Sequence, residues 1–169
     1  MLITTSPVKT LADVKTMKIR APGAYGEFWS KLGAATVTMP FSEVYTSLAT
    51  NVINGNSLST LLDIKSAKFY EVAQYLYPIP VTGVQANGIV ANMDAYNGLP
   101  KDLQAILVRA ADVNCLDWLT TCLNWEQTAL SEMMQTGFQY GPQPSAEDKA
   151  KFMEAAQAVW DSYATKSPE

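Results

Sequence analysis

Short alternating and helical patterns follow one another through the first part of the chain. Residues 17–21 alternate apolar and charged side chains, which is the period-2 pattern of a strand, and a Pro-Gly pair ends the run. Residues 24–32 then follow a helical spacing, and residues 35–39 form another β-like run. The order strand, helix, strand predicts an α/β fold. Arg20 would then stand at the carboxyl end of a strand.

A second strand-to-helix connection is predicted further along. Ser42 is placed to begin a helix, because its hydroxyl can accept from free backbone N–H groups, and Asn51 is placed to close that helix. Residues 52–53 form a very short apolar run that predicts a strand, and residues 54–57 predict a polar turn. Ligands of open α/β sheets collect beyond the carboxyl ends of the strands. The loops after Arg20 and after residue 53 are therefore the two candidate sites.

Helical patterns dominate the rest of the chain. Residues 58–77 are predicted to be mostly helical with a break near Ser66, and residues 81–93 to form one strand or two. Residues 101–136 predict a helix of about 54 Å at ~1.5 Å per residue, which either spans two domains or packs against a partner. A short strand and an amphipathic last helix follow, the helix beginning at a capping-box sequence that starts with Ser145.

Composition narrows the classes of function. The chain has 169 residues, 48% of them apolar, so it can bury the core of one domain. Its formal net charge of −4 offers no basic surface for nucleic acid. No apolar run approaches the roughly 20 residues that cross a bilayer. The first residues lack the basic region and apolar stretch of a signal peptide, so the expectation from the sequence as written is no export signal.

The chemistry of an enzyme is not evident. The sequence contains no histidine, no Gly-rich phosphate loop and no nucleophile elbow, and its carboxylates show no spacing suited to a metal or an acid/base pair. Cys115 and Cys122 lie seven positions apart in a helical stretch, about 10.5 Å along the axis, which is too far for a disulfide. We therefore expect neither catalysis nor a cofactor or metal.

Four blocks of sequence carry a family resemblance. LADVKTMKIRAPG, LGAATVTMPFSEVYTSLATNVINGN, KFYEVAQYL and NGLPKDLQ resemble, in order and spacing, the substrate-binding proteins of tripartite ATP-independent periplasmic (TRAP) transporters, the DctP-like family. The resemblance implies a periplasmic, two-lobed α/β clamp with a long lobe-spanning helix. Such a protein captures a small organic carboxylate and hands it to membrane permease subunits, and it does no catalysis.

The resemblance also implies a division of the chain. Residues 1–82 would be the α/β core of the second lobe, and residues 83–123 the crossing strand and helix that complete a first lobe whose opening elements are not in this sequence. Residues 124–169 would pack on the second lobe. We expect weak or undetectable ligand affinity for such a partial clamp. The alternative is a non-binding structural fragment that self-associates, as a homo-oligomer, through its exposed lobe face.

The resemblance assigns the substrate carboxylate to Arg20, because the family's K-I-R-x-P-G strand end carries the arginine that pairs with it. A planar fork of donors matches a carboxylate in a way that lysine cannot. The alternative for Arg20 is a surface salt bridge. Phe41 is placed to contact the apolar body of the ligand, with simple core packing as the alternative.

Five further residues complete the candidate site. Tyr25 and Trp29 could line the cleft from the first loop, although aromatic residues at helical spacing also belong to cores. Asn54, Asn56 and Ser57 can offer hydrogen-bond donors and acceptors, but Asn and Ser are also ordinary turn residues. The family turn usually reads Asp-Gly where this chain has Asn54 and a glycine, so the register of the last three assignments is open.

Overall fold

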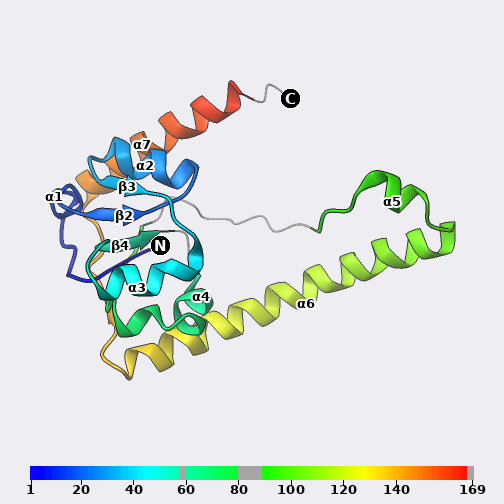
Figure 1. Cartoon of the computed structure of the whole chain (residues 1–169), viewed down its shortest axis with the longest axis horizontal. Coiled ribbons are helices and arrows are strands. Elements are labelled where there is room, and N and C mark those ends of the chain that lie inside the picture. The colour runs from blue at the N-terminus through cyan, green and yellow to red at the C-terminus, as the bar shows by residue number, and fades with distance from the viewer. Residues whose placement is uncertain (58–59, 80–88, 167–169) are drawn as a thin grey trace. The chain divides into compact units, whose positions relative to one another are not determined.

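The computed structural model of the chain describes residues 1–57, 60–79 and 89–166, which fall into two compact units (Figure 1). Unit 1 comprises Met1–Gly83 and Ala129–Glu169, and unit 2 comprises Val84–Thr128. The long helix α6 (Lys101–Met134) contributes to both units. It confirms the long helix expected from the sequence. No helix within the described ranges combines the length and the apolarity needed to cross a bilayer.

Unit 1 is built on a six-stranded sheet of order β3-β2-β4-β1-β5-β6. Strand β1 is antiparallel to both of its neighbours, whereas β2–β3, β2–β4 and β5–β6 are parallel pairs. The other strands therefore all run opposite to β1, and their carboxyl ends lie at the end of the sheet where β1 begins. The strands are β1 (Leu2–Thr4), β2 (Lys18–Arg20), β3 (Ala35–Val37), β4 (Gly55–Ser57), β5 (Tyr75–Tyr77) and β6 (Gln139–Tyr140).

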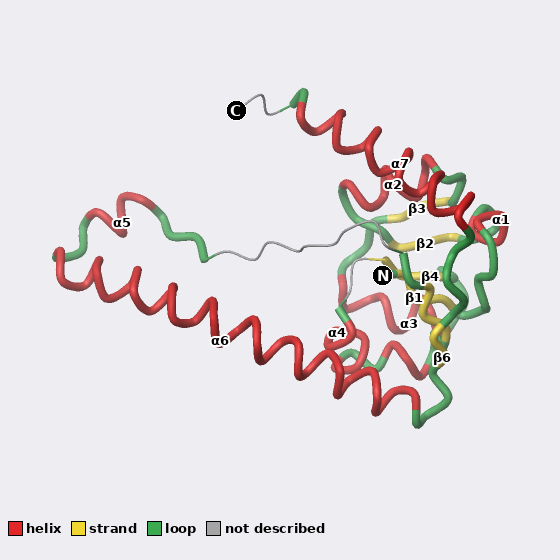
Figure 2. The backbone as a smooth tube through the Cα atoms, turned by 180° about the vertical axis from the view of Figure 1, so that it is seen from behind, coloured by secondary structure: helices red, strands yellow, loops and turns green. Residues whose placement is uncertain are grey.

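Helices cover both faces of this sheet, so the predicted α/β fold is confirmed. Figure 2 shows the strands in yellow between α2 and α7 on one side and α3 and α4 on the other. Along β1, Leu2 joins one buried apolar cluster and Ile3 the other, as the period-2 alternation of a strand requires. The helical elements of unit 1 other than α6 are α1 (Leu11–Val14), α2 (Ala24–Lys31), η1 (Phe41–Glu43), α3 (Val44–Ala49), α4 (Leu61–Ser66), η2 (Phe69–Glu71) and α7 (Ala146–Ala164).

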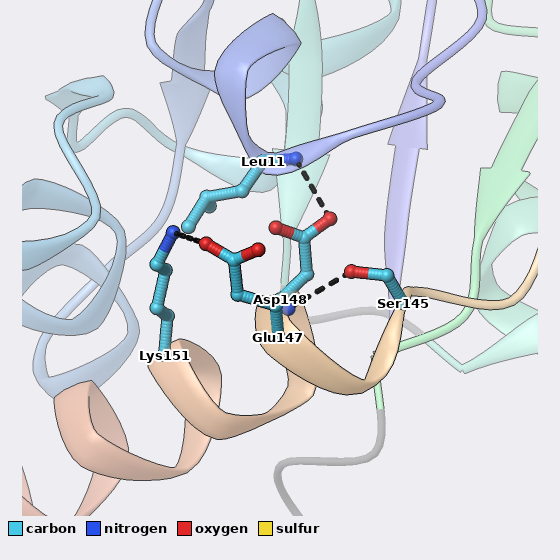
Figure 3. A network of polar contacts seen from close by, with 5 residues as sticks. All are labelled: Leu11, Ser145, Glu147, Asp148 and Lys151. Carbon is cyan, nitrogen blue, oxygen red and sulfur yellow. Dashed lines mark hydrogen bonds and ion pairs between the residues drawn. The ribbon is translucent and has the colours of Figure 1, made fainter.

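Helix α7 is fixed at its start by the capping residue that the sequence predicts. The Ser145 hydroxyl accepts from the backbone N–H of Asp148 at 3.0 Å (Figure 3). The Asp148 carboxylate accepts from the backbone N–H of Leu11 at 3.3 Å, so it ties α7 to α1. Further along, Phe152 packs its ring 6.2 Å from that of Tyr77. These contacts seat α7 against the sheet.

Unit 2 consists, in its described part, of α5 (Met93–Asn97) and most of α6. The buried Gln104 side chain donates to the carbonyls of Tyr96 and Leu99 at 3.1 and 2.9 Å and so holds α5 against α6. In unit 2, α6 leaves many large apolar side chains at least two-fifths exposed: Leu103, Ile106, Leu107, Val108, Val113, Trp118, Leu123 and Trp125.

The short strand predicted at residues 52–53 is wrong. Strand β4 begins only at Gly55, and Ile53 is a fully buried residue of the preceding loop. A Cβ atom at Gly55 would lie 3.1 Å from a methyl carbon of Leu2 and 3.2 Å from the carbonyl oxygen of Ile3. The close approach of β1 therefore favours a residue without a side chain at the start of β4.

Two other local predictions are corrected. Tyr75–Tyr77 is strand β5, not part of a helix, because it pairs with β1 on one side and β6 on the other. Ser42 does not cap a helix, because α3 begins at Val44 after the single 3₁₀ turn η1. The predicted break near Ser66 is confirmed where α4 ends. The strand predicted at residues 81–93 falls largely on residues 80–88, outside the described residues.

Tyr77 is the end of β5 and carries a buried polar group. Its side chain is 1% exposed, and its hydroxyl has no hydrogen-bond partner among the described residues. Burial, and after it the carboxylates of Asp148 and Asp13, raise the pKa of Tyr77 to about 12. The folded state therefore holds this proton more tightly than the unfolded chain, in which a tyrosine has a pKa of about 10.

We expect Tyr77→Phe to reduce the alkaline sensitivity of the fold. The stabilisation from the raised pKa is complete below pH ~10 and is lost as the pH rises towards 12. Chemical unfolding between pH 7 and 11.5 measures how far the free energy of unfolding falls as the pH rises. We expect this fall to be smaller in the variant than in the parent, by up to about 2 kcal/mol. At pH 7 the variant should be as stable as the parent or more so, because an unpartnered hydroxyl is removed. The exposed Tyr140→Phe is the control, and an identical pH profile for both variants would refute the expectation.

Gly26 is required by a close approach between α2 and the end of β2. A Cβ atom there would lie 2.6 Å from the backbone carbonyl oxygen of Ala21. We expect Gly26→Ala to lower the free energy of unfolding by about 1–3 kcal/mol, because the clash with backbone outweighs the better helix propensity of alanine. Urea unfolding followed by circular dichroism measures the change. Lys31→Ala, on the exposed side of the same helix, should change stability by less than about 0.5 kcal/mol. A more stable Gly26→Ala would contradict the steric argument.

Candidate functional site

Arg20 is the last residue of β2 and is held from two sides. The parallel pairing of β2 with β4 places Arg20 opposite Asn56, and Nη1 donates to the Asn56 side-chain oxygen at 3.5 Å. Nε and Nη2 both donate to the backbone carbonyl of Met39, at 3.3 and 3.2 Å. The arginine is only 7% exposed. Its position at the carboxyl end of a strand is as predicted.

The guanidinium of Arg20 has only neutral hydrogen-bond acceptors in the described part of the chain. None of the ion pairs found there involves it. Burial lowers the pKa of Arg20 from the ordinary value of an arginine. Of its five N–H groups, the contacts above engage three and leave one on Nη1 and one on Nη2 for another acceptor. The predicted alternative of a surface salt bridge is not what the structure shows.

Phe41 lies on the same side of the sheet as Arg20. It is part of the 3₁₀ turn that follows β3, and its ring centroid is 5.1 Å from that of Phe69, a buried residue of the cluster beneath α3 and α4. The side chain nevertheless stays 43% exposed. Phe41 therefore packs on the core with part of its ring and presents the remainder outward.

The predicted site residues are divided between the two faces of the sheet. Arg20 follows Ile19, which points into the cluster beneath α2 and α7, so Arg20 and its partner Asn56 point to the opposite face. Ser57 pairs with Leu2 and faces the α2 and α7 side. There it lines a cavity of about 120 Å³ together with Met1, Ala24, Tyr25, Phe28, Trp29, Ile79, Ala156, Val159 and Trp160.

Asn54 lies at the amino end of β2, away from the end that carries Arg20. Its side-chain oxygen accepts from the backbone N–H of Lys18 at 3.1 Å, and its carbonyl accepts from the backbone N–H of Thr5 at 2.9 Å. Lys18 begins β2, whereas Arg20 ends it. Asn54 thus stabilises the amino end of the β2–β4 pair, away from the guanidinium.

The sequence reasoning missed the carbonyl of Met39. The pairing of β3 with β2 ends at Val37, and the residue before a proline is held in an extended conformation, so the carbonyl of Met39 lies beyond the paired strand and accepts from Arg20. The predicted extension of the third strand to residue 39 was the signal that could have found it. Within the described ranges, no group of three or more acidic or cysteine side chains gathers as a metal site would require.

Comparison with known proteins gives a consistent family. Residues 1–167 match the model of the family "bacterial extracellular solute-binding protein, family 7" (DctP). A solute-binding protein of Sulfitobacter sp. is 29% identical over 167 residues, which cover 98% of this chain and 49% of that protein. The 2,3-diketo-L-gulonate-binding periplasmic protein of Escherichia coli is 36% identical over 109 residues, covering 63% and 32%. This chain therefore spans about half the length of the first relative, and its match to the second covers about a third of that protein.

Solved structures share the fold. A TRAP periplasmic solute binding protein from Desulfovibrio desulfuricans with bound sn-glycerol-3-phosphate superposes with a TM-score of 0.84 at 23% identity, covering 99% of this chain and 53% of that one. A TRAP periplasmic solute binding protein from Desulfovibrio salexigens with bound orotic acid gives 0.83 at 25% identity, covering 98% and 53%. The predicted lobe of a periplasmic binding protein is thereby confirmed.

Proposed function

Because this chain belongs to the family 7 bacterial extracellular solute-binding proteins, we propose that it captures a small organic carboxylate in the periplasm for delivery to a TRAP membrane permease. Relatives named for 2,3-diketo-L-gulonate and sialic acid, and a relative solved with orotic acid, support a carboxylate as the ligand class. The family consists of solute-binding proteins, not enzymes.

The observation that carries the proposal is the buried Arg20 without an acidic partner among the described residues. The two N–H groups that remain, one on each terminal nitrogen, match the two oxygens of a carboxylate. Charge-assisted hydrogen bonds of this kind contribute roughly 1.5–3 kcal/mol each. A bound carboxylate would place a negative charge beside the buried cation of Arg20.

We assign the site to Arg20, Asn56 and Phe41. Asn56 lies beside the guanidinium, and the exposed part of the Phe41 ring offers an apolar surface on the same side of the sheet. Tyr25, Trp29 and Ser57 are left out of the carboxylate site because they face the other side. Asn54 is left out because its side chain binds the start of β2.

The strand ends support a site that a second lobe could cover. Strand β5 ends with Tyr77 at the end of the sheet where β2 ends with Arg20, and unit 2 follows β5 in the sequence. We therefore propose that unit 1 is one lobe of a two-lobed binding protein. Unit 2 would belong to the other lobe, and closure of the two lobes would exclude water from the ligand. The isolated chain should bind weakly.

Arg20 variants test the carboxylate site. The chain has two arginines, so an ¹⁵N spectrum of arginine Nε–H groups has one signal for Arg20 and one for Arg109. D-Glucuronate and orotate should shift the Arg20 signal saturably, in the millimolar range for the isolated chain. Arg20→Lys should weaken binding at least about tenfold, because lysine keeps the charge but loses the fork. Arg109→Gln and the uncharged methyl ester of glucuronate are the controls. Carboxylate binding that survives Arg20→Lys unchanged would sink the assignment.

Asn56→Asp tests whether the missing negative charge is what the ligand supplies. The substitution is isosteric and places a carboxylate against Nη1 of Arg20. We expect ligand affinity to fall at least about tenfold, because the internal ion pair occupies the cation, while the unfolding midpoint stays equal or rises. Calorimetric titration and thermal unfolding measure the two effects. Unchanged affinity with a retained fold would contradict the role given to the buried charge.

Addition of a second lobe should raise the affinity of this chain for carboxylates. Fusion of this chain to the part of the Sulfitobacter relative that the match does not cover would supply the other lobe. We expect at least about tenfold tighter carboxylate binding by the fusion, still dependent on Arg20. A sub-micromolar dissociation constant for the isolated chain would overturn the need for a second lobe.

The alternative function is that of a structural fragment that self-associates through unit 2. The apolar side chains exposed along α6, among them the Trp118–Trp125 pair with ring centroids 6.1 Å apart, favour this alternative. Large apolar side chains left exposed in such number favour an association surface. The surface is compatible with cover by a second copy or by the other lobe of the binding protein.

Sedimentation velocity tests whether a second copy of this chain covers the exposed surface of α6. Self-association predicts a concentration-dependent dimer that Ile106→Glu disrupts, because Ile106 is 60% exposed and a buried carboxylate in an interface is costly. Gln127→Glu adds the same charge at another exposed position of the helix and should leave the dimer intact. A monomer at all concentrations would exclude the alternative.

A further inference from the structure

The cavity on the α2 and α7 side of the sheet, next to Ser57, differs in its lining from the carboxylate site. Four of the side chains that line it are aromatic (Tyr25, Phe28, Trp29 and Trp160) and none is charged; the ionisable group among the lining residues is the α-amino group of Met1, whose pKa burial lowers so that its neutral form is favoured. Its volume of about 120 Å³ is close to that of an apolar cavity of ~150 Å³, engineered in another protein, that binds benzene. The space therefore suits one small ring.

Trp29 lines this cavity and carries a polar group that is unpartnered within the described ranges. The side chain is 1% exposed, and its indole Nε1 has no acceptor among the described residues. Buried tryptophan N–H groups usually find a partner, and an unpartnered one costs roughly 1–3 kcal/mol. A water molecule would need two to four polar partners, and this lining is mostly apolar. A ligand that is apolar apart from one acceptor atom fits the lining better.

We propose that this cavity binds a small uncharged ring compound with one carbonyl oxygen, which accepts a hydrogen bond from Trp29 Nε1. The apolar body of the compound would pack against the aromatic lining. The site is distinct from the carboxylate site, because Trp29 and Ser57 face the side of the sheet opposite to Arg20. The inference therefore does not rest on the proposed transport function.

Cyclohexanone and methylenecyclohexane form a matched pair of probes, since the second replaces the carbonyl oxygen by a CH₂ group of similar shape. The ¹⁵N-labelled chain has four tryptophans and hence four indole Nε1–H signals. Trp29→Phe assigns the signal of interest, and where that variant fails to fold, Trp118→Phe, Trp125→Phe and Trp160→Phe at exposed positions assign it by elimination.

Cyclohexanone should move the Trp29 signal saturably, and methylenecyclohexane should bind roughly fivefold more weakly because it lacks the acceptor. Ala24→Leu places a larger side chain in the cavity and should weaken cyclohexanone binding at least about tenfold, with Ala156→Val as the second blocking variant. Either blocking variant should leave the shift of the Arg20 signal by glucuronate unchanged. The proposal is overturned by a Trp29 signal that does not respond, by equal affinity for the two probes, or by full affinity in a folded blocking variant.

Discussion

A buried guanidinium without a counter-charge is the constraint around which unit 1 is organised. Arg20 reaches its position because the parallel pairing of β2 with β4 sets it opposite Asn56, and the chain after β3 brings the carbonyl of Met39 to it. Neutral acceptors satisfy N–H groups but do not offset the cost of taking a cation out of water. The lowered pKa of Arg20 expresses that cost. Under the proposed function, an anionic ligand would supply the charge that these neutral acceptors lack.

The alternation of side chains along three-residue strands then decides which residues can meet the ligand. Neighbouring positions on β4, Asn56 and Ser57, point to opposite faces, and the same rule separates Arg20 from Ile19 on β2. A shift of one residue in the register of β4 would exchange the two faces, placing a serine beside the guanidinium and burying an asparagine under α2. Such a shift would also bring an asparagine to the position of Gly55, where a Cβ atom would lie 3.1 Å from a methyl carbon of Leu2.

The sequence was sufficient to predict the fold class, the long helix, the cap at Ser145 and the placement of Arg20 at a strand end, because each depends on a local pattern or on the family resemblance. It was insufficient for β4 and β5, whose conformation comes from pairing with strands distant in the sequence. Because the predicted strand began at residue 52, three residues before β4 begins, Asn54 moved in the prediction to the carboxyl end of the strand. The division of the candidate residues between two faces required the register, which no local pattern contains.

The two units differ in how well they bury their own apolar surface, and this difference explains why one can fold around a site while the other needs a partner. Unit 1 has helices on both faces of its sheet and two buried clusters. Unit 2 spans only Val84–Thr128, a length at which a chain seldom builds a sufficient core, and its α6 segment leaves large apolar side chains exposed. This chain spans about half the length of the first relative, and the second lobe proposed above would cover that surface. Burial of α6 in that lobe and closure of the lobe over Arg20 would then be two consequences of one association.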